Sequence, residues 1–139
     1  MTNNTGDTVR LGTLELRFLV DESKLVMFEF TIPPGAQVPV RHYHESVDEV
    51  IYGLAGTTTT SRNGEKHELR AGQSLVIPRG SVHTHENLHD ETAKSLIVMT
   101  PGTIGRRYFE EIALALKGPQ KPEPARLKAI MERYGLIPA

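Results

Sequence analysis

The residues best suited to chemistry are histidines, and the most informative of them are His42 and His44, which flank Tyr43. Residues two apart on a β-strand point to the same side of the strand. The pair could therefore present two imidazoles to one metal ion from one rigid element. A lone His-x-His is more often a coincidental surface or core feature, so the pair becomes evidence for a site only if further ligands follow in the chain.

A carboxylate follows five residues after His44, where Glu49 opens the apolar run Val50-Ile51-Tyr52. An isolated buried charge is costly, and metal ligation would satisfy this one. A salt bridge to an arginine, or exposure at the end of the strand, would satisfy it equally well. The adjacent Asp48 faces the other side of a regular strand, so only one of the two carboxylates can be a ligand.

Further along, the chain reads Ser81-Val82-His83-Thr84-His85-Glu86-Asn87, preceded by a glycine- and proline-marked turn. The two regions together resemble the two sequence motifs of the cupin family. The matching residues are His42, His44, Glu49 and Gly56 in the first motif, and Gly72, Pro78, Gly80, His83 and Asn87 in the second. The resemblance covers residues 25–100 approximately, and it implies a double-stranded β-helix, the jelly-roll or cupin barrel.

The resemblance to cupins also implies one divalent metal ion at the centre of the barrel, held by His42, His44, Glu49 and His83. Such a set leaves coordination positions open to water or substrate. Three imidazole nitrogens and one carboxylate suit Fe, Mn, Ni, Co, Cu or Zn, and ligand type alone does not separate these metals.

His85 points the same way as His83 if that strand alternates regularly. It would then stand in the pocket, either as a hydrogen-bond partner of the ligands and proton shuttle or as a satisfied interior histidine without a catalytic part. Both interpretations stay open. We take Glu49 and His85 as the candidate catalytic residues, whereas His67 and His89 lie in polar contexts typical of the surface.

The elements that must position these side chains are predicted to be short strands. From Leu11 to about Thr100 apolar residues recur with a period of two, and Gly or Pro turns separate the runs. Asn63-Gly64 predicts a hairpin, because a type I′ turn needs positive φ at both central residues. The expected fold is all-β. Predicted strands cover 11–20, 24–32, 38–43, 49–54, 57–61, 66–69, 74–77 and 94–99.

After Pro101 the apolar period becomes helical. Ile104, Tyr108, Ile112 and Ala115 share one face, and a second helix is predicted over Pro124–Tyr134. A pair this short should dock on the barrel exterior or on a neighbouring subunit. The predicted organisation is a polar N-terminal segment over 1–10, a cupin barrel over 11–100 and a helical tail over 101–139.

Composition narrows the possible partners. The formal net charge of −1 favours neither nucleic acid nor an anionic membrane, so a small-molecule substrate is expected. The absence of Cys excludes disulfides and thiolate metal sites. The N-terminus lacks the pattern of a secretory signal and no apolar run is long enough to span a membrane, which favours a soluble, cytoplasmic protein. A homodimer is expected, with Leu11–Val20 as a plausible exchanged segment.

Three classes of function are compatible with such a site. The first is a metal-dependent dioxygenase acting on a small enolic or phenolic molecule, as the resemblance of the C-terminal segment to quercetinase-like cupins implies. The second is a metal-dependent isomerase, lyase or cyclase that uses no oxygen. The third is a non-enzymatic cupin that binds a small molecule. We favour the first.

Overall fold

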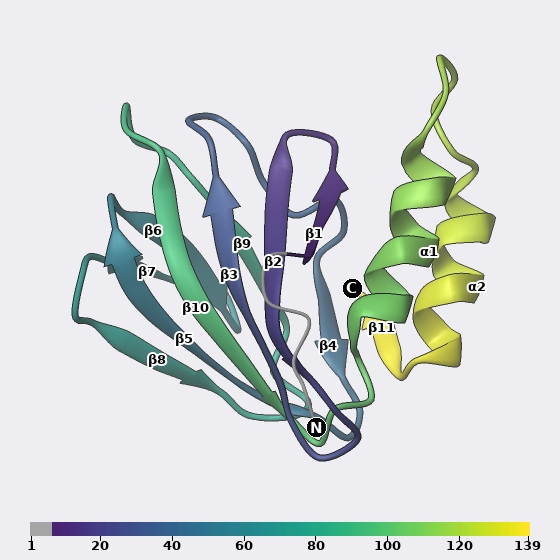
Figure 1. Ribbon diagram of the computed structural model, residues 1–139, viewed down its shortest axis with the longest axis horizontal. Coiled ribbons are helices and arrows are strands. Elements are labelled where there is room, and N and C mark those ends of the chain that lie inside the picture. The colour runs from purple at the N-terminus through teal and green to yellow at the C-terminus, as the bar shows by residue number, and fades with distance from the viewer. Residues whose placement is uncertain (1–6) are drawn as a thin grey trace.

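The structure is a computed structural model that describes residues 7–139, and it consists of two antiparallel β-sheets flanked on one side by two helices (Figure 1). The all-β class with a helical C-terminal part is confirmed. The elements are β1 (Asp7–Leu11), β2 (Leu14–Asp21), β3 (Val26–Ile32), β4 (His42–His44), β5 (Asp48–Ala55), β6 (Thr58–Arg62), β7 (Glu65–Leu69), β8 (Ser74–Ile77), β9 (His83–Glu86), β10 (Ala93–Thr100), α1 (Arg106–Leu116), α2 (Pro124–Arg133) and β11 (Leu136–Pro138).

The two sheets face each other and enclose the core. One has the strand order β1-β2-β3-β10-β5-β8 and the other β11-β4-β9-β6-β7, so strands distant in sequence become neighbours, as in a jelly roll. Alternate residues of β3 and β10 are buried while those between them are partly exposed, which is the period-two pattern of strands with one inner face. The inner faces are therefore where side chains from both sheets meet.

The predicted hairpin at Asn63-Gly64 is confirmed: β6 and β7 pair over their full length, and both turn residues have positive φ, 50° and 87°. A second tight turn was not predicted. Gly12, with φ of 61°, lies in a two-residue turn, since Leu11 pairs with Leu14.

This second turn divides the predicted Leu11–Val20 strand from an earlier one. Residues 7–10, assigned from the sequence to a polar N-terminal segment, instead form β1 with Leu11 and pair with β2. Val9 gives this short strand a buried side chain, 6% exposed. Residues 1–6 of the predicted segment lie outside the described residues.

Strand β4 is shorter than the predicted 38–43 strand, beginning only at His42. Pro39 interrupts the run because its nitrogen cannot donate to a ladder. Val38 instead donates its N–H to the His85 carbonyl, 3.0 Å away, so the segment before β4 still follows the second sheet.

The C-terminal part packs on its own barrel and closes one side of it. In Figure 1, α1 and α2 lie side by side, with α1 next to β1 and α2 next to β11. Phe109 of α1 contacts Phe18 and Phe28 of the first sheet, with ring centroids 5.9 and 5.5 Å apart. The predicted tail also contains a strand, since β11 pairs with β4. Neither helix reaches the length and hydropathy of a membrane span, and the same holds throughout residues 7–139.

We expect Phe18→Ala to lower the free energy of unfolding by about 3–5 kcal/mol, because it removes a fully buried ring that joins β2 to α1. Chemical denaturation measures this change. The matched control is Leu114→Ala on the outer face of α1, where the side chain is 61% exposed and the expected change is below about 0.5 kcal/mol. Equal effects of the two substitutions would contradict the packing described.

Candidate metal centre

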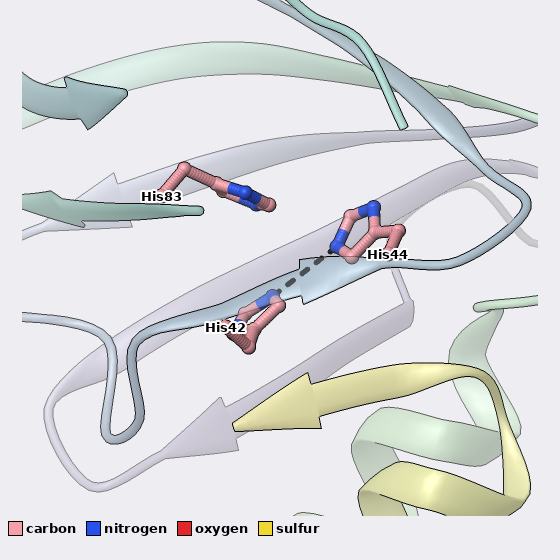
Figure 2. A group of neighbouring side chains, drawn as sticks. All are labelled: His42, His44 and His83. Carbon is pink, nitrogen blue, oxygen red and sulfur yellow. Dashed lines mark hydrogen bonds between the residues drawn. The ribbon is translucent and has the colours of Figure 1, made fainter. Parts of the chain in front are cut away.

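Three buried imidazoles meet on the inner face of the second sheet. His42 and His44 come from β4 and His83 from β9, and His42 and His83 are register partners on adjacent antiparallel strands. Figure 2 shows the three rings directed toward one another. Their ligand nitrogens all lie within 4.8 Å of one another, a grouping that could hold a metal ion.

Backbone carbonyls fix the proton positions on two of these rings. His42 Nδ1 donates to the Val40 carbonyl at 2.8 Å, and His83 Nδ1 donates to the Ser81 carbonyl at 2.9 Å. A neutral ring with its proton on Nδ1 carries a lone pair on Nε2. Both Nε2 atoms are therefore available as ligands, as in metal-binding histidines whose other nitrogen is held by the protein.

The Nε2 atoms of His42 and His44 lie only 3.2 Å apart, as the dashed line in Figure 2 marks. Burial, together with His83 and His44, lowers the pKa of His42 to about 3. Burial also lowers the pKa of His44 to about 4. Both rings are then neutral at neutral pH, which is the form that binds metal. A cation among these nitrogens would stabilise their closely spaced lone pairs.

The carboxylate of Glu49 enters the same space from β5 in the other sheet and is only 4% exposed. Its Oε1 lies 3.4 Å from His83 Nε2 and 3.8 Å from His44 Nε2. Its Oε2 lies 2.8 Å from His85 Nε2. The carboxylate is thus neither exposed nor paired with an arginine, the two alternatives that the sequence left open.

The histidines also set the charge of Glu49. Burial alone would raise the pKa of its carboxyl group, but interactions with His83 and His85 lower that pKa well below its usual value. Burial likewise acts to lower the pKa of His83, but the Glu49 carboxylate raises it above its usual value. The site is therefore a buried anion among imidazoles, with the charge pattern of a cation-binding centre.

Asp48 faces away from this cluster, as alternation along the strand predicts. Its carboxylate accepts hydrogen bonds from Arg79 Nε at 3.2 Å and from Arg79 Nη2 at 3.0 Å, on the exposed side of the sheet. The structure therefore separates the two adjacent carboxylates, leaving Glu49 inside and Asp48 outside.

His85 belongs to the buried cluster, whereas His89 pairs with Glu68 in a half-exposed position. The ligand atoms of Glu49, His83 and His85 form a second group that could hold an ion. His85 Nδ1 also lies 2.9 Å from the Thr60 hydroxyl. Sequence reasoning missed Thr60, because its contact depends on the pairing register of β6 with β9, which no sequence pattern specifies.

A cavity of about 70 Å³ adjoins the cluster. Its walls are almost wholly apolar or aromatic apart from the histidines, Glu49 and Thr84. They include Phe28 and Phe30 of β3, Ile97 and Met99 of β10, Ile104, Tyr108, Phe109 and Ile112 in and before α1, Leu127 and Met131 of α2, and Leu136 of β11. The C-terminal part of the chain therefore supplies one wall of the pocket.

The match to known families agrees with this architecture. Residues 28–99, just over half of the chain, match the family described as the cupin domain. The chain belongs to this family. The match contains most of β3, all of β4 to β9 and most of β10, and so includes all four predicted metal ligands, while the helical wall of the cavity lies beyond it.

The names of individual relatives describe different activities. The chain is 34% identical to the polyketide synthase protein CurC of Streptomyces cyaneus over 49% of this chain and 44% of the relative. It is 29% identical to quercetin 2,3-dioxygenase of Bacillus subtilis over 72% of this chain and 30% of the relative. It thus spans less than half the length of these curated relatives.

Solved structures show the same fold. The structure of KdgF from Halomonas sp. superposes with a TM-score of 0.63 at 21% identity, covering 68% of this chain and 86% of that one. At this identity the likeness describes the fold alone. The double-stranded β-helix predicted from the two motifs is thereby confirmed.

We expect His42→Ala and His83→Ala each to lose most of the metal that the wild-type protein binds, because each removes one of three converging imidazoles. Elemental analysis after loading with Mn, Fe, Co, Ni, Cu or Zn and gel filtration measures the occupancy. His89→Ala, which changes a histidine outside the cluster, is the control. Full occupancy in the two cluster variants would exclude these residues as ligands.

Proposed function

We propose that this chain binds one divalent metal ion through His42, His44, His83 and Glu49 and acts as a dioxygenase on a small, uncharged enolic or phenolic molecule. The observation that carries the proposal is the juxtaposition of a buried histidine and carboxylate cluster with an apolar cavity. When bound, a metal with open positions supplies Lewis acidity toward substrate oxygens and, if redox active, a site for dioxygen.

The cavity wall selects against anionic substrates. None of the described residues that line it is Lys or Arg, so a carboxylate or phosphate group away from the metal would be buried without a counter-charge. Phe28, Phe30 and Phe109 instead offer aromatic surfaces to a planar apolar body. A molecule with an apolar ring and oxygens at one end fits both the wall and the cluster.

The cavity size favours a small substrate. A volume of about 70 Å³ is well below the roughly 300–1,000 Å³ of pockets that take drug-sized ligands. We therefore expect single-ring phenols and short diketones to bind in preference to multi-ring compounds.

The cluster contains a group that can accept a proton from the substrate. Glu49 is held as a carboxylate inside the barrel, where it can accept the proton that an enol or phenol releases on binding. The surrounding apolar walls keep water from competing for the same positions. His85, whose Nε2 lies 2.8 Å from the second oxygen of Glu49, holds the carboxylate in place for this role.

The name of one relative supports an oxidative role on such compounds. Quercetin 2,3-dioxygenase of Bacillus subtilis is named for dioxygen chemistry on a phenolic compound.

We expect the metal-loaded protein to consume oxygen in step with the loss of a catechol or a 1,3-diketone, measured with an oxygen electrode and by chromatography. Oxalate and a sugar phosphate serve as anionic comparisons and should give no uptake. Equal substrate loss without oxygen would instead assign a metal-dependent isomerase, lyase or cyclase. Binding without conversion would assign a non-enzymatic small-molecule cupin.

Glu49→Gln is expected to retain part of the bound metal and to lower turnover by about 10²–10⁴-fold, the usual contribution of a general base. The matched control is Glu45→Gln, which changes an exposed glutamate just after β4. Metal content and turnover are measured on the same samples. Unchanged turnover in Glu49→Gln would exclude the carboxylate as the base.

The proposal also includes the homodimer and the cytoplasmic location predicted from the sequence. The segment Leu11–Val20, which the sequence suggests as an exchanged element, pairs within its own chain in the structure, since β2 pairs with β1 and with β3. Sedimentation analysis of the purified protein distinguishes a dimer from a monomer.

A further inference from the structure

We propose that Thr60 and His85 are positioning residues that hold one oxygen of Glu49, so that only the other oxygen, Oε1, faces the metal position. This inference rests on the proposed metal site. It assigns a role to Thr60, and it makes His85 a partner of Glu49 and not a metal ligand.

The side chains of Thr60, His85 and Glu49 form a continuous series of hydrogen bonds inside the barrel. Thr60 Oγ1 lies 2.9 Å from His85 Nδ1, and His85 Nε2 lies 2.8 Å from Glu49 Oε2. Thr60 is 0% exposed, His85 5% and Glu49 4%, so bulk water does not compete for these contacts. Each of these hydrogen bonds therefore has a large effect on the orientation of the groups that it joins.

Which group donates in each of the two hydrogen bonds follows from the protons that each group carries. An ionised carboxylate only accepts, so His85 Nε2 carries the proton that bonds Glu49. In the neutral ring Nδ1 is then an acceptor, and the Thr60 hydroxyl supplies the proton that it needs. This is the opposite tautomer to that of His42 and His83, whose Nδ1 atoms donate to backbone carbonyls.

In this arrangement the two oxygens of Glu49 have different roles. Oε2 accepts from His85, whereas Oε1 faces the Nε2 atoms of His83 and His44 at 3.4 and 3.8 Å. A cation among the three ligand imidazoles would therefore meet Oε1. His85 has both ring nitrogens engaged, one with Glu49 and one with Thr60, and so offers no lone pair to an ion.

The pairing of β6 with β9 explains why this series of hydrogen bonds is well defined. Thr60 and His85 are register partners on β6 and β9, so their side chains project from directly opposite positions of one sheet. Phe30 packs against the His85 ring in a T-shaped arrangement, with centroids 6.1 Å apart and planes at 79°. His85 is thus restrained from both sides before it reaches Glu49.

The test compares Thr60→Val, which removes the hydroxyl and keeps the shape, with Thr60→Ser, which keeps the hydroxyl. Thr58→Val is the matched control, because Thr58 is buried on the same strand and its hydroxyl bonds only Ser95, at 2.9 Å, among the hydrogen bonds described. The probe is Co(II), whose dissociation constant is measured by competition with a chelator. We expect Thr60→Val to weaken binding by about 10–100-fold, the usual effect of losing such a partner, with Thr60→Ser and Thr58→Val close to wild type.

Two further measurements separate positioning from a general structural defect. The imidazole ¹H–¹⁵N spectrum of the metal-free protein should show the Nε2–H tautomer for His85 and the Nδ1–H tautomer for His83. The number of imidazoles coordinated to Cu(II), counted by pulsed electron paramagnetic resonance, should be three in the wild type and also in His85→Gln.

The outcomes distinguish this inference from the proposed metal site. Wild-type protein that binds no Co(II) would overturn the metal site and this role with it. Normal binding in the wild type and in Thr60→Val alike would overturn only the role of Thr60. Loss of one coordinated imidazole in His85→Gln would show that His85 is itself a ligand.

Discussion

The rest of the molecule is organised around a cluster of polar side chains buried in an apolar barrel. Glu49 carries a negative charge at 4% exposure, and its partners are imidazoles contributed by another sheet. Such a charge is tolerable only when its partners are held in good hydrogen-bonding geometry. Both sheets must therefore keep a fixed register and spacing, which the antiparallel ladders around β5 and β9 provide.

Two parts of the chain contribute different parts of the pocket. The segment that matches the cupin family contributes the polar cluster, and the C-terminal part contributes apolar wall through side chains such as Tyr108, Met131 and Leu136. A barrel that keeps its ligands can thus change what it admits by changing the helices. One scaffold can in this way host several chemistries.

The sequence predicts the centre of the molecule better than its periphery. The spacing of His42 and His44 places them on one face of a strand, the resemblance to the second cupin motif implies His83, and alternation separates Glu49 from Asp48, because each of these signals is local. The partner of His85 could not be found, because it depends on how β6 and β9 align. The closure of the barrel by the helices, the late start of β4 after Pro39 and the early strand β1 likewise depend on packing and turn geometry that a single sequence encodes weakly.

The pairing of β11 with β4 has a kinetic consequence. Strand β4, which carries two of the proposed ligands, shares one register pair with β9 but three with β11. The short strand and the C-terminal part should then open and close as one cooperative unit. The residence time of an ion or a product in the barrel would be governed by fluctuations of β11 and the two helices as well as by the strength of the coordinating bonds.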